Sequence, residues 1–203
     1  MCHVKCGFFE QISQVLNVQK MSKQCLNTFL DKRGTTQTTT PNRTRFAFNF
    51  YLFLQMRIYL DNCCYYRPFD DQKQIAVYLE TQAKLHIQKL IKEGKLELVY
   101  SYVSIFENGN SPNKENRVSV ERFFEFAMAF VGVDKAGEVE KLANDIVKQG
   151  VKSKDALHIA CAIIEKCDYF LTTDKEVLSK YKSEKILVCS PITFLGISEV
   201  SNV

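Results

Sequence analysis

RIYLD, residues 57–61, is a short apolar run of β-prone residues that stops at a carboxylate, Asp61. A second run of the same kind, DYFLTTD at 168–174, stops at Asp174. In an open parallel sheet, functional groups gather at the carboxyl ends of the strands, where helices begin. We therefore expect Asp61 and Asp174 to lie at one edge of such a sheet.

Strand-like and helix-like stretches alternate from Met56 to the end of the chain. The expected strands are Arg57 to Asp61, Leu96 to Tyr100, Val131 to Val133, Tyr169 to Thr173 and Ile186 to Cys189. The expected helices are 70 or 71 to about 93, a short one over 101–107, 118 to about 130, 136–149 and 155 to about 166. This alternation predicts an α/β fold, a three-layer α/β/α sandwich around a central parallel sheet of about five strands.

Capping residues and apolar periodicity suggest how these helices begin and pack. Asp70 or Asp71 can cap the first long helix, and Ser153 can cap the last of the five. Apolar residues recur along the first long helix near a period of 3.6, at Ile75, Leu79, Ala83, Ile87, Leu90 and Ile91. We expect these side chains to face the sheet.

Two further acids stand on expected helices close to strand ends. Glu107 lies in SYVSIFEN at 101–108, and Asp155 lies in SKDALHIA just inside a helix start. Four carboxylates in one place repel one another strongly in a low dielectric. A divalent cation such as Mg²⁺ or Mn²⁺ relieves that repulsion and prefers hard oxygen ligands. The sequence therefore predicts a metal-dependent phosphodiesterase with Asp61, Glu107, Asp155 and Asp174 at its centre.

Each of these acids also has a purely structural explanation. Asp61 can stabilise a turn and Asp174 can cap a helix. Asp155 suits the positive end of a helix dipole, and Glu107 can be a solvated side chain. The joint pattern favours one pocket, because perturbed carboxylates cluster at functional sites.

Five neighbouring residues are candidates for supporting roles. Asn62, Thr172 and Thr173 can hydrogen-bond the site or a phosphate oxygen, although simple turn bonding is favoured for them. Arg67 can reach a phosphate bidentately or form a structural pair with Asp70 or Asp71. His158 follows Asp155 by three positions on nearly the same helix face, where a packed core histidine is favoured over a general base.

Composition narrows the class of protein. The 46% hydrophobic and 25% charged content is that of a globular soluble domain, and no apolar run reaches the roughly 20 residues that cross a bilayer. The eight cysteines include no C-x-x-C pair, and no secretory signal is visible. We expect a cytoplasmic protein with reduced thiols rather than a disulfide framework or a zinc site.

Residues 1–55 differ from the rest of the chain. They carry a net charge of +5, against −1 for the remainder, and include the polar stretch GTTQTTTPNRTR. We expect this segment to be an atypical leader, disordered or translated upstream of a true start at Met56, with a genuine extension as the alternative.

The pattern from 56 to 203 resembles the PIN-domain family of metal-dependent nucleases. The resemblance rests on YLDNCCYYRPFDDQ at 59–72, SYVSIFEN at 101–108, KDALHIACA at 154–162 and YFLTTD at 169–174. Asp61, Glu107, Asp155 and Asp174 match the four acidic positions of the family. Thr173 stands where many members have Asn, and the leader has no counterpart.

The opening LDNCCYYRPFDD is similar to one bacterial and archaeal subgroup, and many members resemble toxin ribonucleases of type II toxin–antitoxin pairs, the VapC kind. The resemblance implies an Mg²⁺- or Mn²⁺-dependent endoribonuclease with an RNA substrate, a homodimeric state and an antitoxin partner. A non-catalytic PIN-like module that binds RNA or protein is the alternative. A phosphatase with Asp61 as nucleophile is disfavoured, because Cys63 stands where such enzymes have a second carboxylate.

Overall fold

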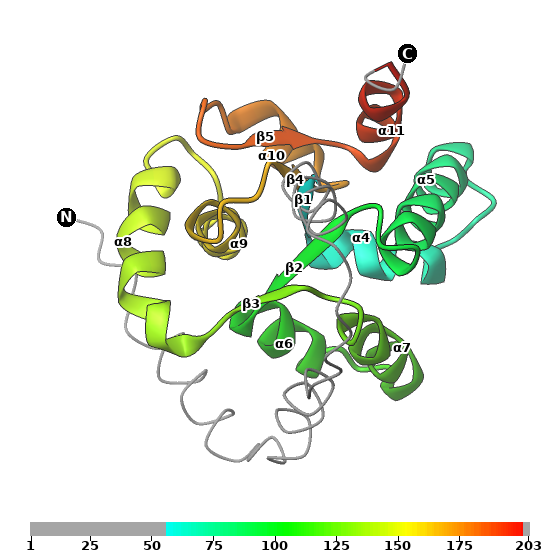
Figure 1. Cartoon of the computed structure of the whole chain (residues 1–203), viewed down its shortest axis with the longest axis horizontal. Helices are drawn as coiled ribbons and strands as arrows, with labels where there is room; N and C mark the ends of the chain where they lie inside the picture. Colours follow the sequence, from blue (N-terminus) through cyan, green and yellow to red (C-terminus); the bar gives the residue numbers. More distant parts are fainter. Residues whose placement is uncertain (1–55, 201–203) are drawn as a thin grey trace, which may run out of the picture. The chain divides into compact units, whose positions relative to one another are not determined.

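The structure is a computed structural model that describes residues 56–200 (Figure 1). Its centre is a parallel sheet of five strands in the order β3-β2-β1-β4-β5. The strands are β1 (Arg57–Leu60), β2 (Glu97–Ser101), β3 (Ala129–Val131), β4 (Tyr169–Leu171) and β5 (Leu187–Cys189). The predicted α/β class and parallel five-stranded sheet are confirmed. The leader lies outside the described residues.

Helices cover both faces of this sheet. They are α4 (Asn62–Tyr66), α5 (Ile75–Lys92), α6 (Tyr102–Gly109), α7 (Lys114–Phe124), α8 (Ala136–Val147), α9 (Ser153–Ile164), α10 (Lys175–Lys180) and α11 (Pro191–Val200), with 3₁₀ turns η1 (Arg67–Phe69) and η2 (Val133–Lys135). Figure 1 shows α8 and α9 on one side of the sheet and α5 and α11 on the other. Among the described residues, no helix has the length and apolar character to cross a membrane.

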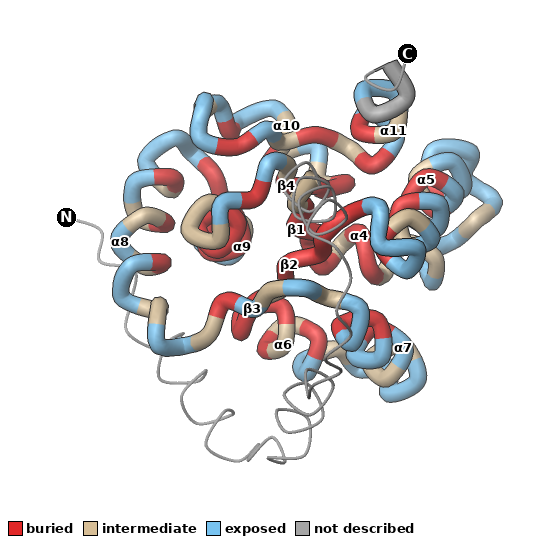
Figure 2. Tube along the Cα trace, in the orientation of Figure 1, coloured by how far each residue is buried: buried red, intermediate tan, exposed pale blue. Residues whose placement is uncertain are grey.

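The alternation of side chains along β1 explains the three layers. Ile58 and Leu60 belong to a buried cluster with residues of α5, α7 and α11, whereas Tyr59 points to the opposite face and stacks on Phe170. The helix on that second face, α9, is buried from Ala156 to Ala162 (Figure 2). A strand that is apolar on both faces is what a covered parallel sheet requires.

The predicted start of α5 is wrong, and its predicted buried face is correct only in part: Ala83, Ile87 and Ile91 are buried and Leu90 packs against the core. The helix begins at Ile75 after Gln74, and Asp71 instead accepts a hydrogen bond from the backbone N–H of Lys73 in the preceding turn. Ile75 and Leu79, predicted to face the sheet, are 77% and 49% exposed.

The buried face of α5 includes two polar residues that hydrophobic periodicity cannot assign. Thr81 donates to the carbonyl of Arg67, and the Nζ of Lys84 donates to the carbonyl of Tyr65. These bonds satisfy backbone groups of the α4–η1 segment and turn that face inward.

Four other boundaries differ from the predictions. Helix α7 begins at Lys114 rather than Val118, because Asn113 caps it by accepting from the N–H of Asn116. It ends at Phe124, so the backbone enters the sheet earlier and β3 starts two residues before its predicted position. Ser153 does not cap α9; it is the first residue of the helix, after Lys152.

Candidate active site at the carboxyl ends of the central strands

The carboxyl ends of β1 and β4 bring Asp61 and Asp174 to one edge of the sheet. Leu60 pairs with Leu171 in register, so Asp61 lies level with Thr172. The hydroxyl of Thr172 donates to Asp61 Oδ2 over 2.7 Å and accepts from the backbone N–H of Asp174 over 3.0 Å. One buried threonine thus links the two acids, which sequence reasoning placed at this edge.

The two acids hold equivalent positions but bond differently. Asp61 precedes α4 and makes no side-chain capping bond to it, although only 5% of the residue is exposed. Asp174 precedes α10 and caps it, because its Oδ1 accepts from the N–H groups of Glu176 and Val177 over 2.7 and 3.4 Å. The helix-capping alternative therefore holds for Asp174, whose Oδ2 takes no part in the cap, whereas Asp61 makes no helix cap.

Asp155 lies in the first turn of α9, and the charges of the other three acids affect its pKa. Burial, together with the negative charges of Asp61, Asp174 and Glu107, raises the pKa of Asp155 to about 6 against the opposing effect of His158. A raised carboxyl pKa with these causes means that the four side chains share one electrostatic environment. The sequence prediction brought the same four acids together.

Glu107, near the end of α6, is fixed by the side chains of His158 and Lys154. Its Oε2 lies 3.0 Å from His158 Nε2, and its Oε1 lies 3.7 Å from Lys154 Nζ. Burial raises the pKa of Glu107, but the hydrogen bond and charge of His158, the charge of Lys154 and a hydrogen bond from Asn62 outweigh burial and hold that pKa below its ordinary value. Glu107 is therefore a paired carboxylate rather than a freely solvated one.

His158 is a packed core histidine, as the sequence favoured, and it also contacts Glu107. The imidazole is 1% exposed, as a packed core histidine should be, yet its Nδ1 lies 2.8 Å from the hydroxyl of Tyr59 while its Nε2 faces Glu107. The same tyrosine hydroxyl contacts Ser101 and Ser104 over 2.6 and 2.8 Å. This buried chain runs from the sheet to Glu107 and fixes the orientation of the ring.

The pKa of His158 reflects this setting. Burial lowers it, but the hydrogen bond to Glu107 and the charges of Glu107, Asp61 and Asp155 raise it above the ordinary value. The available sequence signal was the helical spacing of His158 from Asp155; its partner Glu107 is 51 positions away and leaves no local pattern.

The predicted supporting residues have distinct surroundings. Arg67 pairs with Asp70 over 2.9 Å and with Glu80 over 3.0 Å, and its Nη2 donates to the hydroxyl of Thr173 over 2.6 Å. Its guanidinium is thus engaged in structural contacts. Asn62 is buried, and its Oδ1 has no hydrogen-bond partner among the described residues.

Cys63 also contacts this site, a role the sequence analysis did not assign. Its thiol donates to Asp61 Oδ2 over 3.2 Å, lies 3.3 Å from the hydroxyl of Thr172 and accepts from the N–H of Thr173 over 3.3 Å. The sulfur therefore joins the segment after β1 to the segment after β4. Only its position two residues after Asp61 could have drawn attention to it.

A divalent cation, the cofactor that the resemblance implies, fits these residues by charge and chemistry. Asp61, Glu107, Asp155 and Asp174 offer hard oxygen donors, and the raised pKa of Asp155 shows repulsion that a cation would offset. Within the described part of the chain, however, no three or more His, Cys, Asp or Glu side chains are gathered closely enough to form a ready-made metal site.

Two comparisons with known proteins gave a match. One solved structure to which the chain is similar is the "Crystal structure of VapBC2 from Rickettsia felis bound to a DNA fragment from their promoter", with 14% identity, a TM-score of 0.43 and coverage of 66% of this chain and 98% of that chain. No curated protein matches the chain. The family model for the PIN domain matches residues 58–183, which include all four acids. Because that match spans more than half of the sequence, the chain belongs to the PIN domain family.

Proposed function

We propose that this chain is a metal-dependent endoribonuclease that hydrolyses phosphodiester bonds in RNA with Mg²⁺ or Mn²⁺ as cofactor. PIN domains are generally nucleases and typically use a divalent metal, which supports a hydrolase acting on nucleic acid. The observation that carries the proposal is the raised pKa of Asp155, because it arises from Asp61, Asp174 and Glu107 together. An anionic cluster of this kind is suited to hold a cation beside a phosphate.

In the proposed reaction, Asp61, Glu107, Asp155 and Asp174 hold the metal, which when bound lowers the pKa of a water and neutralises charge on the attacked phosphate. Thr172 orients Asp61, and His158 orients Glu107. A carboxylate of this set can accept the proton of the attacking water. Asn62, Arg67, Thr172 and Thr173 are proposed supporting residues.

The proposed biological role is that of the toxin in a type II toxin–antitoxin pair. This role rests on the resemblance of LDNCCYYRPFDD at 60–71 to toxin ribonucleases. We propose a cytoplasmic homodimer whose anionic pocket is blocked by an antitoxin segment. An inserted Arg could replace the charge of the cation and pair with two carboxylates.

The alternative is a non-catalytic PIN-like module that binds RNA or protein. It is favoured by one observation: among residues 56–200, no group of three potential ligands is preassembled for a metal. The buried chain from Tyr59 through His158 to Glu107 favours the enzyme instead, because an unused set of paired carboxylates would lower stability for no gain.

The deciding experiment incubates the purified chain with a mixed RNA pool in Mg²⁺, in Mn²⁺ and in chelator, followed by sequencing of the RNA ends. The nuclease proposal expects new ends with metal, none in chelator, and recovery when Mn²⁺ is restored. Undiminished cutting in excess chelator would exclude the metal mechanism. Absence of cutting with either metal would favour the binding module.

The toxin role has a separate test in cells. Expression of the chain alone should slow growth, and co-expression of the product of the neighbouring reading frame should relieve it. Harmless expression of protein that cleaves RNA in vitro would remove the toxin role and leave the nuclease proposal intact.

A further inference from the structure

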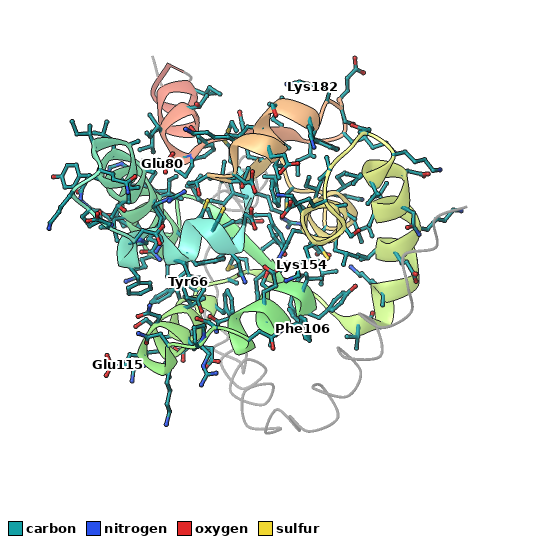
Figure 3. All side chains as sticks on the ribbon, turned by 180° about the vertical axis from the view of Figure 1, so that it is seen from behind. Tyr66, Glu80, Phe106, Glu115, Lys154 and Lys182 are labelled. Atoms are coloured by element: carbon teal, nitrogen blue, oxygen red, sulfur yellow. The ribbon has the colours of Figure 1, made fainter. Side chains whose placement is uncertain are left out.

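A pocket of about 370 Å³ lies beside the four acids and shares only Glu107 with them. Its lining comes from α4, from α6 with the two residues that follow it, and from the start of α9. The lining residues are Asn62, Cys63, Tyr66, Glu107, Asn110, Ser111 and Lys154. Tyr66 and Lys154, both labelled in Figure 3, are its aromatic and its cationic side chains. The pocket thus combines an aromatic ring, two amides, a hydroxyl and a cation.

The ring of Tyr66 is held in a fixed orientation. Its hydroxyl donates to Asn108 Oδ1 over 2.6 Å, and Phe69 packs edge-on against the ring at 6.1 Å between centroids. Asn108 is itself buried, and its Nδ2 donates to the carbonyl of Arg117 and to Glu121. A ring clamped at its hydroxyl and at one edge loses little freedom when a flat group stacks on it.

The polar lining suits a nucleotide rather than a peptide cation. Lys154 is ion-paired with Glu107 over 3.7 Å, yet 62% of its side chain is exposed, so its ammonium can also meet a phosphate that approaches from solvent. The amide of Asn110 and the hydroxyl of Ser111 supply hydrogen-bonding groups for a base or a ribose.

We propose that this pocket binds one unpaired nucleotide of a single-stranded RNA, with its base stacked on Tyr66 and a backbone phosphate beside Lys154. The inference rests on the proposed function and adds the residues that hold the substrate beside the four acids, Tyr66 for a base and Lys154 for a phosphate. A base inside a duplex is stacked on both faces and paired along its edge, so it cannot enter such a pocket. Proteins that act on single strands use aromatic platforms and a nearby cation in this way.

The test is equilibrium binding in chelator, where no variant can cut by the proposed mechanism. The probes are a fluorescein-labelled single-stranded RNA decamer and an RNA hairpin with a stem of ten base pairs. Tyr66→Leu should weaken binding of the single strand by about five- to a hundredfold and leave hairpin binding unchanged. Tyr66→Phe keeps the ring and should stay within about threefold of the wild type, because stacking needs no hydroxyl. Tyr78→Leu, at an exposed tyrosine of α5 outside the pocket, is the matched control and should change nothing.

Lys154→Gln provides a second test, which does not alter Tyr66 or its packing. It should weaken binding several-fold at low salt and reduce the salt dependence by about one phosphate contact. The pocket assignment is overturned if Tyr66→Leu binds the single strand as tightly as the wild type, if it weakens the hairpin equally, or if Tyr66→Phe fails as badly as Tyr66→Leu. It is also overturned if Lys154→Gln leaves both affinity and salt dependence unchanged.

These outcomes separate the pocket from the proposed function. Suppose that the wild type binds the single strand and cuts RNA with metal, but that the Tyr66 variants change nothing. That result removes only the pocket assignment. A wild-type protein that binds neither RNA in chelator removes the pocket, whereas the nuclease proposal is overturned only by the cutting assay with Mg²⁺ or Mn²⁺. A Tyr66→Leu protein that loses binding of an Arg-containing peptide but not of RNA would assign the pocket to a protein partner and overturn the RNA assignment.

Discussion

The junctions β1–α4 and β4–α10 are built alike, yet their acids do different things. Each places an aspartate between the carboxyl end of a central strand and the first turn of a helix. Asp174 uses one oxygen to cap its helix, whereas Asp61 leaves its helix uncapped and is bonded by Thr172 and Cys63. A helix N-cap position therefore does not define the role of an acid; the partners of its oxygens do.

Asp61→Asn should produce the largest effect on RNA cleavage. It tests directly whether Asp61 has a different role from Asp174. If Asp61 holds the metal, RNA cleavage should fall by two orders of magnitude or more, because activation of water is lost. Stability in chelator should hold or rise, since one repulsive charge leaves the cluster. The measurement pairs an RNA cleavage assay with thermal melting of the same preparation. A lower melting point with unchanged cleavage would show that Asp61 is a structural residue after all.

Asp155 provides a pH test of the shared electrostatic environment. Its folded pKa of about 6 lies above the ordinary 3.8, so the folded state binds this proton more tightly than the unfolded state does. Stability in chelator should therefore fall as pH rises from about 4 to about 6, by on the order of 1–3 kcal/mol after allowance for screening.

Asp155→Asn isolates this effect. The variant lacks the titrating group, so its free energy of unfolding relative to the wild type should rise through the same pH window and stay level above it. Urea unfolding at several pH values between 4 and 7.5 measures the difference. Mn²⁺ should reduce it, because a bound cation offsets the repulsion. A difference that does not vary with pH would show that Asp155 does not share a site with the other acids.

Thr172→Val asks whether the two junctions act as one unit. Valine keeps the shape but removes the hydroxyl that donates to Asp61 and accepts from the N–H of Asp174. We expect a loss of about 1–3 kcal/mol in the free energy of unfolding, since a buried N–H loses its acceptor, and a drop in cleavage. Thr172→Ser keeps the hydroxyl and should retain most of the activity. Equal activity of the two variants would mean that the link is incidental.

Much of this architecture could be predicted from local patterns. Short β-prone runs that end at Asp61 and Asp174 are visible in the sequence, and the rule that parallel strands end at one edge brings them together. The sheet and its parallel strands were predicted correctly from such patterns, and the family was predicted correctly from the resemblance of the motifs to known members. The metal ligands themselves remain predictions.

Other features depend on partners that are distant in sequence. The inward face of α5 is set by bonds from Thr81 and Lys84 to carbonyls of an earlier segment, so hydrophobic periodicity chose the wrong face at Ile75 and Leu79. His158 and Glu107 are 51 positions apart, and no spacing rule pairs them. A helix cap was one alternative for Asp174 in the sequence. Only the hydrogen bonds in the structure show that Asp174 makes such a cap and that Asp61 does not.

The smallest expected effect concerns the helix cap at Asp174, and two substitutions sharpen it. Asp174→Ala removes the acceptor of the N–H groups of Glu176 and Val177 and should lower the free energy of unfolding by about 1 kcal/mol. Asp174→Asn caps nearly as well and should lose only a few tenths of that. Urea unfolding in chelator measures both. If Asp174 also holds the metal, cleavage should fall in both variants, because neither retains the carboxylate. An asparagine variant that keeps both full stability and full cleavage would show that Asp174 serves only as a helix cap. The two junctions would then differ in that Asp61 is a functional acid and Asp174 a structural one.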